Sequence, residues 1–159
     1  MEFSLLADEP ESVPLVATWY FDQWCKDTGR YTYEQMEKKL STSINREQAP
    51  LILLAKVKGE LAGAAELKIR EMDEFPEYEY WIGGVYVAES HRGKGIAARL
   101  VDELKYRAGK MDITSLYLQT EDLTGGLYTK RGFRPIIELE SKWGRVAVMK
   151  ADLASENLV

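Results

Sequence analysis

The residues best suited to chemistry lie in one short stretch that contains glycine, Arg92-Gly93-Lys94-Gly95-Ile96-Ala97. Its two glycines let the backbone curl so that successive N–H groups point into one concavity, and a helix that begins here adds a partial positive charge. Arg92 and Lys94 place full positive charges at the rim, where cationic side chains bind phosphate oxygens strongly. The stretch therefore predicts a binding site for an anion the size of a pyrophosphate.

The same glycines also satisfy the pattern of dinucleotide-binding proteins, in which an acidic residue follows roughly 20 positions later, here Glu121. Two features of the context count against this reading. Ala88 to Arg92 separate the turn from the preceding strand, and the chain before it reads as an antiparallel hairpin. A nicotinamide-binding oxidoreductase therefore stays open as the weaker alternative. A nucleoside-triphosphatase loop is excluded because no Gly-Lys-Ser or Gly-Lys-Thr is present.

The elements that must position this turn can be predicted from hydrophobic periodicity. Tyr80–Val87 reads as a buried strand, and Gly83-Gly84 in its middle indicates a bulge or a close backbone approach. A helix follows the turn, with apolar residues on one face at Ile96, Leu100, Val101, Leu104 and Ala108, and Gly109 near its end. Ser115–Thr120 is the next strand, so this strand-helix-strand unit should be the parallel part of a sheet.

The remaining segments complete a mixed α/β fold. We expect a central sheet of about seven strands with helices on both faces. The further strands are predicted at Phe3–Ala7, Leu51–Val57, Leu61–Ile69, Phe133–Leu139 and Arg145–Lys150, and the further helices after Ser12, over Tyr33–Leu40 and over Leu123–Arg131.

Length and composition limit the class of protein. A chain of 159 residues and 18.2 kDa fits a single domain over 1–159, with 152–159 expected to be loose. The net charge of −5 disfavours a nucleic-acid platform, and the single cysteine, Cys25, excludes an internal disulfide and a metal site built from several cysteines. The longest apolar run, Leu51–Ala55, is far shorter than the roughly 18 residues of a membrane span. Met1-Glu2-Phe3 does not begin a signal peptide, so we expect a cytoplasmic protein with no membrane association.

The sequence resembles the GCN5-related N-acetyltransferase family (GNAT). Its signature, Gln or Arg, two residues, Gly, one residue, then Gly or Ala, is met by Arg92, Gly95 and Ala97. A second family feature, a tyrosine on a short helix before Gly-Phe, is met by Tyr128 with Gly132-Phe133. Val146–Lys150 is similar to the last strand of the family. The similarity is good over roughly 51–153 and only in outline over the first fifty residues.

The resemblance implies a single-domain enzyme with acetyl-CoA as co-substrate and a mostly antiparallel sheet with one splayed parallel pair. The pyrophosphate would bind the turn formed by Arg92, Gly93, Lys94, Gly95, Ile96 and Ala97. The pantetheine arm would pair with the exposed edge of the strand at Val85, Tyr86 and Val87, whose backbone N–H groups would polarise the acetyl carbonyl. The acceptor would be the amine of a small molecule or peptide. Many relatives dimerise, so a homodimer is also implied.

The resemblance also suggests the catalytic groups. Tyr128 is the expected general acid, because a phenol titrates near 10 and a thiol near ~8.5, so the neutral phenol can protonate the leaving sulfur. In histone-type relatives the base is a glutamate on the strand before the turn, and the matching position here is Trp81. Glu79, two residues earlier and on the same strand face, is the best substitute, with Glu66 next.

Several residues have two interpretations. The carboxylates of the run Glu71–Glu79 either attract a cationic acceptor or form a solvated loop. Trp19, Tyr20, Phe21 and Trp24 either line the acceptor pocket or belong to the core. His91 is placed on the surface or on the phosphate side rather than in catalysis, and Cys25 reads as a buried hydrophobe. Gly125-Gly126 indicates a late helix start or a close cofactor. Because Trp81 replaces the carboxylate, a non-catalytic acyl-CoA sensor also stays open.

Overall fold

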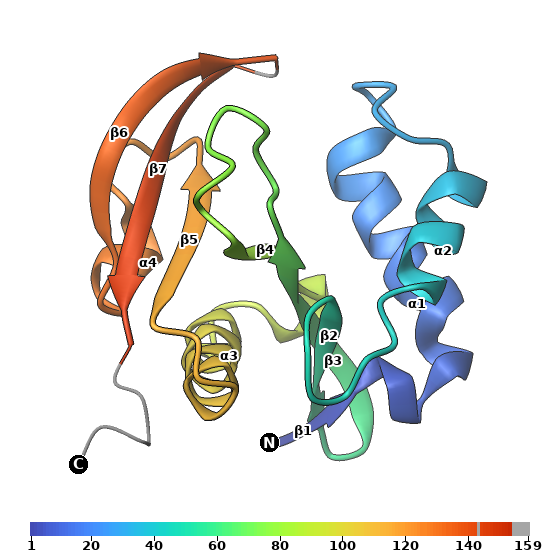
Figure 1. Ribbon diagram of the computed structural model, residues 1–159. Helices are drawn as coiled ribbons and strands as arrows, with labels where there is room; N and C mark the ends of the chain where they lie inside the picture. Colours follow the sequence, from blue (N-terminus) through green and yellow to red (C-terminus); the bar gives the residue numbers. More distant parts are fainter. Residues whose placement is uncertain (143, 154–159) are drawn as a thin grey trace.

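A seven-stranded sheet forms the centre of the computed structural model, which describes residues 1–142 and 144–153 (Figure 1). Its strand order is β1-β2-β3-β4-β5-β7-β6, and every neighbouring pair is antiparallel except β4 with β5. The predicted mixed α/β fold with one parallel pair is therefore confirmed. The strands are β1 (Glu2–Leu5), β2 (Leu51–Val57), β3 (Glu60–Ile69), β4 (Tyr80–Val87), β5 (Ser115–Thr120), β6 (Arg134–Ser141) and β7 (Gly144–Asp152).

Helices cover both faces of the sheet, as predicted. The four α-helices are α1 (Val13–Tyr20), α2 (Tyr33–Ser41), α3 (Ile96–Lys110) and α4 (Gly126–Thr129). Alternate residues of β2 point to opposite faces of the sheet. Leu51 and Leu53 belong to the hydrophobic cluster that includes α3, whereas Ile52 and Leu54 belong to the cluster that includes α1 and α2. Figure 1 shows α1 and α2 beside each other and well separated from α3. No helix within 1–142 or 144–153 has the length and apolar character to cross a membrane.

Shorter helical turns connect these elements. A π-helical turn (Phe21–Cys25) continues directly from α1, and 3-10 turns span Leu6–Asp8, Pro10–Ser12 and Glu89–His91. The start of α2 is fixed by a capping box, in which the Thr32 hydroxyl accepts from the N–H of Gln35 at 3.1 Å and the Gln35 side chain accepts from the N–H of Thr32 at 2.9 Å.

The parallel pair separates almost as soon as it forms. Trp81 opposite Tyr117 is the one register pair between β4 and β5. On its other side β4 contains a bulge, because Gly84 and Val85 together oppose the single Ala65 of β3. Gly84 has φ of +55°, which is left-handed backbone that favours glycine. The predicted bulge is confirmed. Because β5 pairs with β4 only at Trp81, the other edge of the second half of β4 has no strand partner.

Several elements differ from their expected boundaries, most of them by one or two residues. The first strand ends at Leu5 instead of Ala7 because a 3-10 turn begins at Leu6. The helix expected over Leu123–Arg131 is only Gly126–Thr129, because Gly125 has φ of +85° and Gly126 φ of +50°. The glycines therefore mark a late helix start. Of the tail, Asp152 still belongs to β7 and the N–H of Leu153 donates to the Thr114 carbonyl at 2.9 Å, while 154–159 lie outside the described residues.

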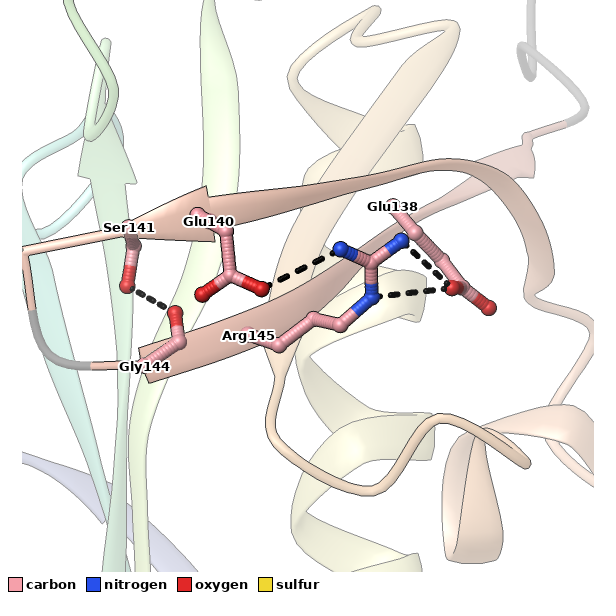
Figure 2. Close-up of polar contacts among 5 residues, drawn as sticks. All are labelled: Glu138, Glu140, Ser141, Gly144 and Arg145. Atoms are coloured by element: carbon pink, nitrogen blue, oxygen red, sulfur yellow. Dashed lines mark hydrogen bonds and ion pairs between the residues drawn. The ribbon is translucent and has the colours of Figure 1, made fainter.

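The hairpin of β6 and β7 extends along the edge of the sheet to the cavity described below. Figure 2 shows Arg145 of β7 reaching across to two carboxylates of β6, with Nη2 3.3 Å from Glu138 and Nη1 3.2 Å from Glu140. The Ser141 hydroxyl donates to the Gly144 carbonyl at 2.7 Å. Exposed ion pairs of this kind contribute about 0–1 kcal/mol each, so they favour the hairpin register without dominating stability.

Candidate active site

A first cavity of about 480 Å³ lies between the free edge of β4 and the start of α3. Eight of the nine residues predicted for the donor site line it, and only Lys94, which is exposed, does not. The predicted residues in its lining are Val85, Tyr86, Val87, Arg92, Gly93, Gly95, Ile96 and Ala97. The structure thus brings the separated strand edge and the glycine turn to one cavity.

The turn has the conformation that the two glycines predict. Gly93 and Gly95 both have φ of +78°, and a Cβ added at either would meet nothing within 4 Å, so the requirement for glycine is conformational. Gly95 is the N-cap of the 15-residue α3, and no side chain caps that helix. The first N–H groups of α3 therefore face the cavity end without a capping acceptor, which is the arrangement that binds anions.

Arg92 is held in place at the edge of this cavity. Its Nε donates to the Val87 carbonyl at 2.9 Å, and its guanidinium lies 5.4 Å from the centre of the Tyr86 ring. His91 is buried beside it, with Nε2 3.6 Å from a carboxylate oxygen of Glu60. His91 also lines this first cavity. These positions agree with a phosphate-side location for His91.

A second cavity of about 560 Å³ adjoins the first, and the two share Gln23, Trp24 and Val85 in their linings. Tyr128, the expected general acid, lies in the second cavity, partly buried with its ring edge-on to Phe133. Burial, and then the charge of Glu71, raises the pKa of the Tyr128 phenol above its usual value near 10. The phenol is therefore protonated at neutral pH and able to donate.

A charged cluster, formed by the buried Glu66 and the partly buried Lys68 and Glu71, lies in the same cavity. The Lys68 ammonium is 3.0 Å from Glu71 Oε1 and 3.8 Å from Glu66 Oε2, with side-chain exposures of 21% for Lys68, 18% for Glu71 and 6% for Glu66. Burial alone would lower the pKa of Lys68, but the two carboxylates outweigh it and hold that pKa above its ordinary value. When all three groups are ionised, the cluster carries one excess negative charge.

Gly83 and Gly84 provide the space for these polar groups. A Cβ on Gly83 would lie 2.9 Å from Cε of Lys68 and 3.1 Å from Oε1 of Glu71. A Cβ on Gly84 would lie 2.9 Å from the Tyr20 hydroxyl oxygen. The close approach indicated by the glycine pair is therefore made by side chains of the chain itself, and it brings the cluster and Tyr20 against β4.

Some aromatic residues of the first helix and the turn after it line a cavity, as predicted for an acceptor pocket, and others pack in the core. Tyr20 and Trp24 line the second cavity, whereas Trp19 stacks on Tyr86 with ring centres 5.2 Å apart and Phe21 packs against helix α2. Tyr20 is only 2% exposed, and its hydroxyl has no hydrogen-bond partner among the described residues. Burial, followed by the charge of Glu66, raises its phenol pKa well above the usual value.

Glu79 is not brought together with Tyr128. Its side chain is 44% exposed, lies 3.5 Å from Nη2 of Arg70 and lines neither cavity. Trp81, at the position of the carboxylate of histone-type relatives, is buried and donates from Nε1 to the Tyr78 carbonyl at 2.6 Å. The geometry therefore gives no support to Glu79 as the base, whereas Glu66 and Glu71 line the same cavity as Tyr128.

Only one end of the acidic run reaches the cavity. Glu71 lines it, whereas Asp73, Glu74 and Glu77 are exposed, and the aromatic residues between them pack over the sheet, with Tyr78 stacked on Tyr117 at 4.1 Å. Lys68 was not found by sequence reasoning. The available signal was the pair of charged residues at alternate positions 66 and 68 of an otherwise apolar strand, which places both on one face.

Comparisons with known proteins agree with this geometry. A family model described as "Acetyltransferase (GNAT) family" matches residues 13–133. No curated protein matches the sequence significantly.

Among solved structures, a ribosomal-protein-alanine N-acetyltransferase from Brucella melitensis is similar with a TM-score of 0.75 and 19% identity over 96% of this chain and 100% of that one. An aminoglycoside 6'-acetyltransferase type Ii matches with a TM-score of 0.72 and 20% identity over 96% and 97%. An aminoglycoside 6'-N-acetyltransferase complexed with coenzyme A matches with 0.71 and 17% over 96% and 97%. At these identities the likeness establishes the fold.

Proposed function

Because the chain belongs to the acetyltransferase (GNAT) family, we propose that it transfers the acetyl group of acetyl-CoA to a primary amine by direct attack within a ternary complex. The observation that carries this proposal is the shared wall of the two cavities. The first cavity contains the anion-binding turn, the second contains Tyr128, and both are lined by Val85 of the separated strand β4. A donor lying in the first cavity would thus present its acetyl end to the second.

The residues present fit coenzyme A. The uncapped start of α3 and the left-handed Gly93 and Gly95 suit its pyrophosphate, with Arg92 and Lys94 adding charge. The edge of β4 at Val85–Val87 has no strand beside it, and an arm with two amides can pair there as a strand would. When bound, the coenzyme supplies the activated thioester. Holding it beside the amine accounts for much of the rate.

Groups of the protein itself then stabilise the developing negative charge and transfer the protons. Backbone N–H groups of Val85–Val87 polarise the acetyl carbonyl. The phenol of Tyr128, kept protonated by its raised pKa, gives its proton to the departing sulfur. The acceptor's proton leaves to water or to a carboxylate. Glu79 was predicted for that role, but it lines neither cavity, and the carboxylates that line the second cavity are Glu66, Glu71, Glu121 and Asp122.

A non-catalytic acyl-CoA sensor is the second candidate, favoured by one observation. Trp81 stands where histone-type relatives carry the catalytic glutamate, and it is buried outside both cavities. No such observation favours nicotinamide binding, because β4 before the glycine turn pairs antiparallel with β3 and so does not open a parallel dinucleotide unit.

Thiol release from acetyl-CoA over a broad panel of amines tests the proposal. We expect turnover with some amine in the wild type, retained coenzyme affinity but loss of most turnover in Tyr128→Phe, and loss of affinity in Gly95→Glu. Calorimetry with acetyl-CoA and with NAD separates the donor classes. Binding of acetyl-CoA without turnover of any amine would favour the sensor, and unchanged turnover in Tyr128→Phe with chemistry rate-limiting would remove the acid assignment.

A further inference from the structure

The charged cluster of Glu66, Lys68 and Glu71 has more acceptor capacity than the protein itself uses. The contact between Lys68 and Glu66, at 3.8 Å, is too long for a hydrogen bond. Oε2 of Glu71 is buried and finds no hydrogen-bond partner in the part of the chain that the structure describes. An unsatisfied buried oxygen is unfavourable, and one lysine cannot neutralise two carboxylates. A cation bound in the cavity would neutralise the second carboxylate and could donate a hydrogen bond to Oε2 of Glu71.

The charges of the whole second cavity point the same way. Three cationic and four anionic side chains line it, so one carboxylate is in excess. They are Arg30, Lys39 and Lys68 against Glu66, Glu71, Glu121 and Asp122. Lys39 lies 5.2 Å from the centre of the Tyr31 ring, and Asp122 accepts hydrogen bonds from Thr124. Within this set the charged cluster has two carboxylates and one ammonium, and so by itself an excess of one negative charge when all three are ionised.

Tyr20 gives independent support for a ligand at this place. Its side chain is buried almost completely, lines the cavity, and its hydroxyl has no partner among residues 1–142 and 144–153. That hydroxyl lies against Gly84, next along β4 from Gly83, on which Lys68 and Glu71 pack. An ammonium or guanidinium group has several N–H donors, so it can serve Glu71 and the Tyr20 oxygen together.

The cluster suits a cation that does not itself react. A carboxylate beside an amine stabilises the protonated form, which has no lone pair to attack the acetyl group. The acetyl end, by the proposed function, lies near Val85, two residues along β4 from Gly83. At roughly 3.3 Å per extended residue the two positions are at most about 6–7 Å apart, because the bulge at Gly84 shortens the path. An acceptor with two cationic groups at that spacing would place its reacting amine near Val85 and its second cation at the charged cluster.

Resting on the proposed function, we propose that the acceptor is at least dicationic, with a second ammonium or guanidinium group bound by Glu71, Glu66 and Tyr20 within about 7 Å of the amine that is acetylated. Lys68 holds the two carboxylates against Gly83 and so positions them. The acceptor class is therefore that of diamines, polyamines and similar cations, and acceptors with a carboxylate at the second position are rejected.

Three matched acceptors test the inference: 1,4-diaminobutane, butylamine and 4-aminobutyrate, which differ only at the second position. We expect kcat/KM for the diamine to exceed that for butylamine by at least about tenfold, the scale of one charge-assisted hydrogen bond, with 4-aminobutyrate the poorest. Glu71→Gln should remove the preference, so that kcat/KM for the diamine falls to the value for butylamine measured with the same variant. Glu77→Gln, an exposed position in the same loop, should keep the preference.

The outcomes separate this inference from the proposed function. If butylamine and the diamine are acetylated equally well, or if Glu71→Gln keeps the wild-type preference, the second-cation site is wrong and the acetyltransferase stands. If no amine is acetylated, calorimetric titration of the acetyl-CoA complex with 1,4-diaminobutane still decides the site: binding that Glu71→Gln weakens and Glu77→Gln does not supports it, and no binding overturns it. Urea unfolding of each variant checks that it is folded.

Discussion

Replacing Gly84 by alanine tests whether the glycine pair of β4 exists to admit polar side chains. A Cβ at this position would lie 2.9 Å from the Tyr20 hydroxyl oxygen and 3.0 Å from Cζ of the same ring. The backbone there has φ of +55°. Gly59, in the turn between β2 and β3, provides the matched control, because its φ is +79° and an added Cβ would meet nothing within 4 Å.

The difference between the two variants isolates the contact with Tyr20. Left-handed backbone at a residue other than glycine costs about 1–2 kcal/mol, which both variants lose. Overpacking of a well-filled site costs a further ~1–3 kcal/mol. Only Gly84→Ala carries this cost, because the Tyr20 ring that it meets is buried in the hydrophobic cluster around α1. We therefore expect a loss of about 1–2 kcal/mol in the free energy of unfolding for Gly59→Ala and about 2–5 kcal/mol for Gly84→Ala.

Urea denaturation followed by fluorescence measures both losses, and the m-values show whether the unfolding transitions are comparable. For a chain of 159 residues, a further loss of 2 kcal/mol corresponds to a Tm lower by roughly 4–8 °C. Equal losses in the two variants would show that Tyr20 adjusts without cost, and the explanation of Gly84 by close packing would then fail. The same variant should also raise the acceptor KM, because the displaced Tyr20 lines the acceptor cavity.

Three further predictions concern Tyr20, the charged cluster and the hairpin. Tyr20→Phe removes a buried hydroxyl with no partner in the described chain, so urea unfolding should show a gain of about 1 kcal/mol together with a higher KM for 1,4-diaminobutane; a loss of stability would show that the hydroxyl is satisfied. Lys68→Met leaves the carboxylates of Glu66 and Glu71 facing each other and should destabilise the fold by about 3 kcal/mol. The pKa of Lys68 is raised in the folded protein, so its contribution to stability is present below about pH 10.4 and is lost as the pH rises through the folded pKa. The difference in free energy of unfolding between wild type and Lys68→Met should therefore be constant from about pH 8 to 10 and shrink at higher pH. A difference that grows above about pH 10 would contradict the raised pKa. Arg145→Ala removes exposed ion pairs and should cost less than about 1 kcal/mol, and a larger loss on urea unfolding would show that the pairs act as a network.

The central strand and the residues that line the first cavity could be predicted because their sequence signals are local. Tyr80–Val87 is bounded by charged and turn-forming residues, and the structure places β4 at those positions. The glycine turn also encodes its own geometry, since left-handed backbone at Gly93 and Gly95 is what glycine permits. The helix near Tyr128 was expected to be longer because the apolar pattern was counted through Gly125-Gly126, where left-handed backbone prevents helix.

The acceptor cavity could not be predicted in the same way, because its residues meet only through tertiary structure. Glu79 and Glu71 bracket one acidic loop, and sequence alone favours the residue nearer to Trp81. The loop turns so that its aromatic residues pack on β5 and β7, which sends Glu71 inward and leaves Glu79 paired with Arg70. The loop that carries Glu71 to the second cavity is thus packed through tertiary contacts such as that of Tyr78 on Tyr117, residues 39 positions apart.

The single register pair between Trp81 and Tyr117 divides the catalytic groups between two mechanical units. The unit of β1 to β4 carries Val85 and the charged cluster, and the unit of β5 to β7 carries Tyr128, with α3 as the covalent crossover between them. A coenzyme arm bound along the free edge of β4 would lie between β4 and β5 and so fix the angle between the two units. Alignment of the acid with the acceptor site would then be a product of donor binding, so donor and acceptor should bind in a preferred order, donor first.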